Sequence, residues 1–125
     1  MAAAELVVKQ GGTIILPVAC PDGVGSEGFY EWMVSASCPE DVIERFKEEG
    51  YSIGTSKAWL YSRCLIKAEL IVVSDGLDEV TLSRMFTEKA PDFETALNMA
   101  LERQGKDAKV LVMRNAADMI PRKKR

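Results

Sequence analysis

The sequence predicts an α/β fold, a Rossmann-like domain of three α/β/α layers on a mostly parallel sheet of about four strands. Two segments, 13–19 and 69–74, are apolar on both faces and rich in β-branched residues, which is typical of strands buried in a parallel sheet. Helical patterns separate these segments, and no two-residue hairpin turn joins neighbouring strands. Parallel strands connected in this way need crossovers, which are right-handed in nearly every case.

Local signals place the individual elements. Residues 1–10 predict the end of a helix that enters the domain, because residues 2–9 are rich in Ala and Leu and Gly11-Gly12 ends the pattern. Ser37-x-x-Glu40 predicts a capping box for the next long helix, and Asp92 should cap the last one. The expected helices are 2–9, 29–34, 39–50, 56–67, 77–82 and 93–104. The expected strands are 13–19, 69–74, 85–88 and 109–113, and a basic tail covers 115–125.

The composition limits the classes of function. The 125 residues, 47% hydrophobic and 28% charged, suit one soluble domain. A net charge of −3 gives no reason to expect nucleic acid or an acidic membrane as partner, and no apolar run approaches the roughly 20 residues of a membrane span. Three cysteines without C-x-x-C spacing predict reduced thiols in a cytoplasmic protein. The chain has no histidine, so its catalytic equipment is thin, which indicates part of a larger assembly.

The loop after the first strand is the first candidate site. It contains Asp22, Gly23, Gly25 and Ser26, and open α/β sheets bind ligands at the carboxyl ends of their strands. Gly23-Val-Gly25-Ser-Glu-Gly28 fits the dinucleotide-binding pattern, but no acidic-ended second strand follows within roughly 30 residues. A structural turn, or a loop that lines a cleft shared with another domain, is therefore favoured. Asp22 could cap the next helix, form an Asx-turn or orient a polar substrate, and the local structural roles are the more frequent.

The start of the helix at 56–67 is the second candidate, with Ser56, Lys57 and Trp59. Thr55 or Ser56 would cap this helix, and its first-turn amides together with Lys57 could bind a carboxylate or a phosphate. The alternative is a capped helix with a solvated lysine. Cys20 is better explained as a small buried residue than as a nucleophile, because the chain has no histidine to activate it.

Two stretches resemble the start of the C-terminal domain of the nickel-dependent lactate racemase family: Val7 to Leu16, with its Gly-Gly-Thr element, and Asp22 to Phe29. Lys57-Ala58, the strand that ends at Ser74, the helix from Asp92 and the segment 108–113 agree in the same order. The resemblance covers nearly the whole chain. It implies two α/β domains with the active site between them, and inversion of an α-hydroxy acid by hydride transfer with a nickel-pincer nucleotide.

The resemblance also implies that the cofactor lysine, the nickel-binding histidine and both catalytic histidines belong to the N-terminal domain, which this chain lacks. Relatives often have a histidine or tryptophan near the start of the helix at 56–67, where this chain has Thr55-Ser56-Lys57. The identity of the hydroxy acid therefore stays open.

We predict that residues 1–125 form the C-terminal lid or cleft domain of a two-domain hydroxy-acid racemase or epimerase. Its partners would be the N-terminal catalytic domain and a small hydroxy acid. The isolated chain should hold neither nickel nor cofactor, contain no catalytic residue and be inactive. Lys57 is the first candidate for contact with the substrate carboxylate. The cleft-facing candidates are Asp22, Gly23, Gly25, Ser26, Ser56, Lys57 and Trp59. The alternative function is a free-standing nucleotide-binding or regulatory small-molecule domain.

Overall fold

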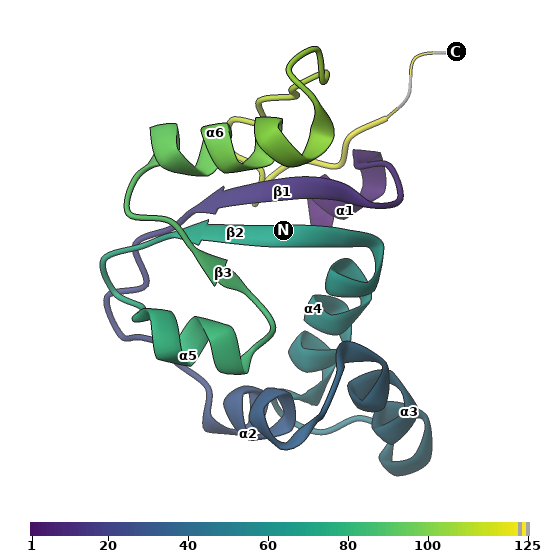
Figure 1. Ribbon diagram of the computed structural model, residues 1–125. Helices are drawn as coiled ribbons and strands as arrows, with labels where there is room; N and C mark the ends of the chain where they lie inside the picture. The colour runs from purple at the N-terminus through teal and green to yellow at the C-terminus, as the bar shows by residue number, and fades with distance from the viewer. Residues whose placement is uncertain (123, 125) are drawn as a thin grey trace.

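Three parallel strands form the centre of the computed structural model, which describes residues 1–122 and 124. β1 (Gly12–Pro17) pairs with β2 (Ala68–Val73) along its whole length. β2 pairs in turn with the short strand β3 (Glu88–Lys89), so the strand order is β1-β2-β3. Helices connect the successive strands (Figure 1), which confirms the predicted α/β fold with a parallel sheet.

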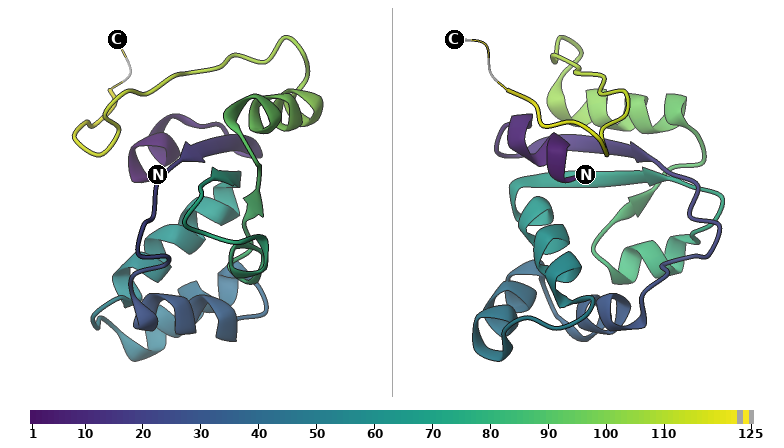
Figure 2. Two further views of the ribbon diagram at one scale, coloured as in Figure 1. Left: turned by 90° about the vertical axis from the view of Figure 1, so that its left-hand side faces the viewer. Right: turned by 180° about the vertical axis from the view of Figure 1, so that it is seen from behind.

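Helices cover both faces of the sheet, in three layers. They are α1 (Ala2–Val7), α2 (Glu27–Ser35), α3 (Pro39–Glu49), α4 (Thr55–Lys67), α5 (Glu79–Arg84) and α6 (Phe93–Gln104). α6 lies alone on one face, and α2, α4 and α5 lie on the other, with α3 packed against α4 (Figures 1 and 2). Among residues 1–122 and 124, no helix has the length and apolar character needed to cross a membrane.

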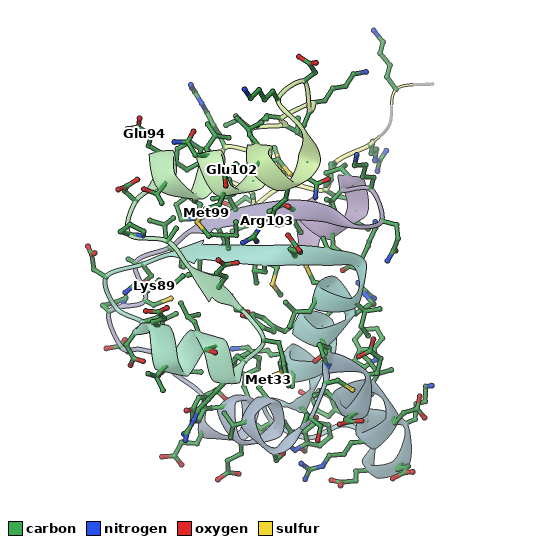
Figure 3. All side chains as sticks on the ribbon, in the orientation of Figure 1. Met33, Lys89, Glu94, Met99, Glu102 and Arg103 are labelled. Carbon is green, nitrogen blue, oxygen red and sulfur yellow. The ribbon has the colours of Figure 1, made fainter. Side chains whose placement is uncertain are left out.

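The alternation of side chains along the strands divides the core in two. Ile14, Leu70 and Val72 join the larger cluster with α2, α4 and α5. Ile71 faces the other way, against Ala96 and Ala100 of α6. Figure 3 shows Met33 in the layer of α2 and Met99 beneath α6. Because α6 contributes mainly small buried side chains, it lies close to the sheet but buries little apolar surface there.

Two of the predicted helix caps are wrong. The N-cap of α3 is Cys38, and Asp41 accepts hydrogen bonds from the backbone N–H groups of Ser37 (2.9 Å) and Cys38 (3.3 Å). Pro39, which has no N–H, occupies the first helical position, so the capping frame lies one residue later than the predicted Ser37–Glu40 box. At α4 the N-cap is Gly54, with φ +90°, and neither Thr55 nor Ser56 caps the helix. Asp92 caps α6 as predicted and accepts from the Thr95 N–H at 2.7 Å.

The predicted fourth strand at 109–113 is also wrong, so the sheet has three strands. Val110, Leu111 and Val112 are 57%, 65% and 73% exposed, and no ladder pairing is found for them in the part of the chain that the structure describes. Their composition favours a strand, but a strand also needs a neighbouring backbone with which to pair.

The third strand and the tail also differ from the sequence prediction or fall partly outside the structure. β3 is shorter and later than the predicted 85–88, because Met85 ends α5 and Phe86 turns the chain at φ +57°. Lys123 and Arg125 of the predicted basic tail lie outside the described residues.

Candidate substrate cleft

The loops that follow β1 and β2 are fastened to each other. The Ser74 hydroxyl donates to the carbonyl oxygen of Ala19 (3.1 Å) and accepts from the N–H of Gly76 (3.1 Å). A Cβ added at Gly76 would lie 1.8 Å from the carbonyl oxygen of Cys20, so only glycine allows the two backbones to approach this closely. These contacts fix the start of the first candidate loop at the carboxyl edge of the sheet.

The rest of this loop turns sharply into α2. Cys20, Gly23 and Gly25 all have positive φ (46°, 66° and 79°), and the N–H of Gly23 donates to the carbonyl oxygen of Cys20 (3.0 Å). Ser26 then caps α2 by accepting from the N–H of Phe29 at 3.4 Å. The glycines therefore serve the turn, and Ser26 has the capping role that was considered for Asp22.

The N-termini of α2 and α4 lie side by side. A Cβ at Gly54 would lie 2.9 Å from the Phe29 nitrogen and 3.0 Å from the Ser26 hydroxyl oxygen. The loop before α4 is clamped by Thr55, whose hydroxyl accepts from the N–H of Ser52 (2.8 Å) and donates to its carbonyl oxygen (3.0 Å). Two helix N-termini, each with partial positive charge, therefore meet at one place.

A hollow of about 460 Å³ opens at this junction. It brings together Gly25, Ser26 and Lys57, three of the predicted cleft residues, from segments about 30 positions apart in the sequence. Val24, Phe29, Leu60 and Tyr61 supply the mostly apolar walls, and Met1 and Ala2 complete the rim. Lys57 is exposed, and no ion pair to it is found among the described residues. We define these nine residues as the candidate cleft.

Tyr61 is the cleft residue with the most perturbed acidity. Burial raises the pKa of Tyr61 to about 12. The Thr87 hydroxyl donates to the carbonyl oxygen of Met85 (3.1 Å), so its oxygen accepts the proton of Tyr61. The Tyr61 ring also packs edge-on against Phe29, with centroids 5.4 Å apart. Tyr61 is therefore a neutral, fixed wall of the cleft.

The other predicted site residues lie outside the hollow. Asp22 is exposed, and neither it nor Gly23 lines the hollow. Trp59 lies on a different side of α4, where its ring contacts Phe46 (centroids 5.7 Å apart) and the Arg63 guanidinium (4.7 Å). Ser56 is half-buried at the start of α4 without lining the hollow.

The residues of this chain do not fit a nickel centre. The sequence contains no histidine. Within residues 1–122 and 124, no group of three or more Cys, Asp or Glu side chains is gathered in a way that could hold a metal ion.

The fold and the hollow define a class of protein: a parallel α/β domain with a hollow where the N-termini of α2 and α4 meet. Residues 1–120 match the family model described as "Lactate racemase C-terminal domain". The chain belongs to this family.

Similar proteins agree with this assignment. The protein named "Lactate racemase" from Thermoanaerobacterium thermosaccharolyticum is 32% identical over 127 residues, which cover 99% of this chain and 30% of that protein. The "Lactate racemase" of Lactiplantibacillus plantarum is 31% identical over 123 residues, 96% of this chain and 29% of that protein. The solved structure of the lactate racemase apoprotein from T. thermosaccharolyticum matches with a TM-score of 0.93 and covers 98% of this chain and 30% of that one. The chain thus spans about 30% of the length of these relatives.

Proposed function

We propose that this chain is one wall of the active-site cleft of a lactate racemase-like isomerase that inverts 2-hydroxy acids. The observation that carries the proposal is the hollow in which Lys57 and the N-terminus of α2 face one space. Both carry positive charge, and a 2-hydroxy acid presents a carboxylate. Membership of the lactate racemase C-terminal domain family supports the reaction class.

In this proposal each cleft residue has a distinct task. Lys57 attracts and orients the substrate carboxylate, while Gly25 and Ser26 shape the backbone around it. Phe29, Leu60 and Tyr61 exclude water when the partner domain closes, which protects a hydride in transit from side reactions. As the family resemblance implies, the hydride acceptor would be a nickel-pincer nucleotide held by a preceding N-terminal domain. We also propose a cytoplasmic location, which the three free cysteine thiols support.

The test is the Lys57→Ala substitution in the full-length parent protein, measured as interconversion of the L and D forms of lactate and of other 2-hydroxy acids. Loss of a charge-assisted contact should raise KM by about tenfold or more, and Lys57→Arg should restore part of the affinity. The control is Lys106→Ala, a lysine exposed after α6 and outside the hollow. An unchanged KM in Lys57→Ala would remove the residue from the site.

The alternative, a free-standing dinucleotide-binding domain, is disfavoured by the position of the glycines. In the dinucleotide-binding fold the glycine turn directly follows the first strand, but here β1 ends at Pro17 and the first glycine of the loop is Gly23. Equilibrium dialysis of the isolated chain with NAD would decide between the two functions. Micromolar binding would support the alternative and contradict our proposal.

A further inference from the structure

The hollow of the candidate cleft has a polar end and an apolar end. The polar end lies where α2 and α4 begin, at Ser26 and Lys57. One turn further along the two helices, Phe29 of α2 meets Tyr61 of α4, with ring centroids 5.4 Å apart. We define the apolar end as the four larger apolar and aromatic residues of the wall: Val24, Phe29, Leu60 and Tyr61. A ligand that occupies both ends must therefore join an anionic group to an apolar one.

The spacing of the two ends decides how large the apolar group must be. On a helix, residues three and four positions apart have Cβ atoms about 5–6 Å from each other, and this is the spacing of Lys57 from Leu60 and Tyr61. In a 2-hydroxy acid the side chain branches from the carbon next to the carboxylate. The methyl group of lactate therefore reaches only about 2.5 Å from the carboxylate carbon, the span of two bonds of about 1.5 Å. A longer side chain, such as isobutyl or benzyl, is needed to reach the apolar end.

The polar group nearest the apolar end is already engaged. The Tyr61 hydroxyl donates to Thr87, which is buried, and the Thr87 hydroxyl donates in turn to the carbonyl oxygen of Met85 (3.1 Å). The Tyr61 ring is therefore what a ligand in the hollow would touch. A charged substituent placed against this wall would lose its hydration without gaining a partner. The apolar end thus selects for hydrocarbon and against a second carboxylate.

The apolar end is held in place before a ligand arrives. The hydrogen bond to Thr87 and the edge-on contact with Phe29 fix the Tyr61 ring, and Phe29 itself is buried. The hollow of about 460 Å³ falls within the range of small-molecule sites, and a lactate ion would leave much of it to water. A ligand with a larger apolar side chain would displace that water at little ordering cost to the protein.

We propose that the substrate is a 2-hydroxy acid with a large apolar side chain, branched or aromatic, in preference to lactate. This inference deepens the proposed function and rests on it for the position of the carboxylate at Lys57. The side chain of the substrate then lies against Phe29, Leu60 and Tyr61, one turn of α4 away from the carboxylate. These residues set the substrate preference and take no part in the chemical step.

Substrate preference in the cofactor-loaded full-length parent tests the proposal. Chiral chromatography gives kcat/KM for 2-hydroxy-3-phenylpropanoate, 2-hydroxybutanedioate and lactate. The value for the phenyl compound should exceed that for lactate by about tenfold or more, because its benzyl group gains the contacts that a methyl group cannot reach. The value for the dicarboxylate should be the lowest of the three.

Variants of the wall test which residues set the preference. Leu60→Trp should fill the apolar end and lower the ratio of kcat/KM for the phenyl compound to that for lactate by about tenfold or more. Val24→Phe narrows the hollow from the loop before α2 and should lower the same ratio, so the test does not depend on the folding of one variant. The matched control is Ile66→Trp, on the same helix but 41% exposed and outside the hollow, and it should leave the ratio unchanged. An unchanged ratio in both wall variants would overturn the proposal.

Binding of the same acids to the cofactor-free parent, measured by isothermal titration calorimetry, separates this proposal from the proposed function. A parent that racemises lactate at least as efficiently as the phenyl compound would overturn the substrate preference and leave the proposed function intact. A parent that racemises none of the acids would contradict the proposed function. The preference would then be supported if the phenyl compound bound at least about tenfold more tightly than lactate and Leu60→Trp removed the difference. Equal binding of the two acids, or binding of neither, would overturn it as well.

Discussion

At the scale of single residues, Gly76 sets the distance between the two loops at the carboxyl edge of the sheet. Its φ is not in the left-handed region, so the need for glycine is steric: a Cβ would lie 1.8 Å from the Cys20 carbonyl oxygen. Gly76→Ala should therefore lower the free energy of unfolding by about 2–4 kcal/mol, since backbone must move to admit the methyl group. Urea denaturation followed by circular dichroism measures this loss.

Gly25→Ala is the control that separates a steric requirement for glycine from a conformational one. Gly25 has φ +79° and nothing within 4 Å of an added Cβ, so the substitution should cost only the left-handed backbone penalty, about 1–2 kcal/mol. If Gly76→Ala were no more destabilising than Gly25→Ala, the loop contact would not be the constraint that we describe.

Tyr61 links the cleft wall to stability at alkaline pH. Its pKa is raised by burial from its usual value of 10 to about 12. Below pH 10 both the folded and the unfolded chain keep the phenol proton, so Tyr61 adds no pH dependence to the free energy of unfolding in that range. Between pH 10 and 12 the unfolded chain loses the proton and the folded chain retains it, so the folded state becomes less stable, by up to about 2–3 kcal/mol.

Tyr61→Phe should remove this alkaline loss. At neutral pH the variant should be about 1 kcal/mol less stable, because the Thr87 oxygen loses its donor. The difference from wild type should shrink or reverse as the pH rises through 10 to 12, measured by denaturant unfolding at each pH. Tyr51→Phe is the control, because Tyr51 is 75% exposed and should show no such trend. A pH-independent difference for Tyr61→Phe would contradict the assignment.

The residue scale also shows why only part of the site could be predicted from sequence. Lys57, Leu60 and Tyr61 share one face of α4 because they are three and four positions apart. Trp59 is two positions from Lys57, and residues at that spacing never face the same way on a helix. The spacing alone could therefore have replaced Trp59 with Tyr61. The sequence could not show that Ser26 and Lys57 line the same hollow. Their proximity depends on tertiary packing, in which Gly54, just before α4, lies close to Ser26 at the start of α2.

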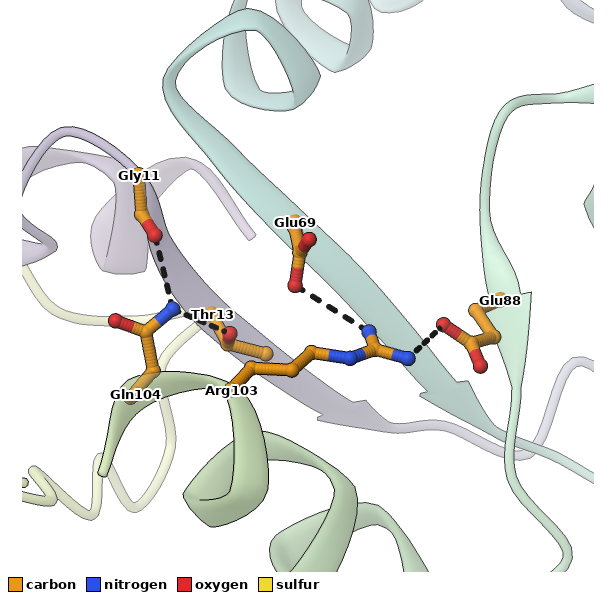
Figure 4. Close-up of polar contacts among 6 residues, drawn as sticks. All are labelled: Gly11, Thr13, Glu69, Glu88, Arg103 and Gln104. Atoms are coloured by element: carbon orange, nitrogen blue, oxygen red, sulfur yellow. Dashed lines mark hydrogen bonds and ion pairs between the residues drawn. The ribbon is translucent and has the colours of Figure 1, made fainter.

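At the scale of elements, α6 is fastened to the sheet as much by polar contacts as by apolar packing. Arg103 donates to Glu69 of β2 (3.3 Å) and Glu88 of β3 (2.7 Å), and the Gln104 amide donates to Gly11 and Thr13 at the start of β1 (Figure 4). The last turn of α6 thus contacts all three strands or the residue before one of them. Because Ala96 and Ala100 bury little area, these contacts should matter more here than on a larger core helix.

Arg103→Ala should therefore destabilise the domain by about 1–2 kcal/mol, more than a typical surface ion pair would. Lys47→Ala is the control, because Lys47 pairs with Glu44 within one helix turn and both side chains are exposed to solvent (2.7 Å). That variant should lose only about 0.5 kcal/mol. Thermal unfolding at low and high salt measures both effects. Equal losses for the two variants would mean that the three-strand contact adds nothing.

The sequence predicted most elements because local signals and tertiary packing agree in them. Local sequence signals agree with the packing at β1 and β2. They also agree at both ends of α6, which Asp92 caps and Gly105 terminates. The failure at 109–113 has a physical origin: the composition of this segment favours a strand, but no neighbouring backbone among the described residues pairs with it. A sequence pattern indicates the propensity of a segment, but it does not show whether a partner strand lies beside that segment.

At the scale of the whole molecule, our proposal that this chain is one wall of a larger active site can be tested directly. The chain has a hollow with a cation and apolar walls, but its residues offer no histidine and no metal cluster within 1–122 and 124. In our proposal the hollow orients a 2-hydroxy acid, and the hydride carrier that inversion needs is held elsewhere in the parent polypeptide. The 125-residue chain alone should therefore show no racemisation of lactate by chiral chromatography and less than one tightly bound nickel per chain by metal analysis. The full-length parent, loaded with its cofactor, should show turnover under the same conditions. Measurable turnover by the isolated chain, or stoichiometric nickel in it, would contradict the proposal that another part of the parent polypeptide supplies the metal ligands and the hydride carrier.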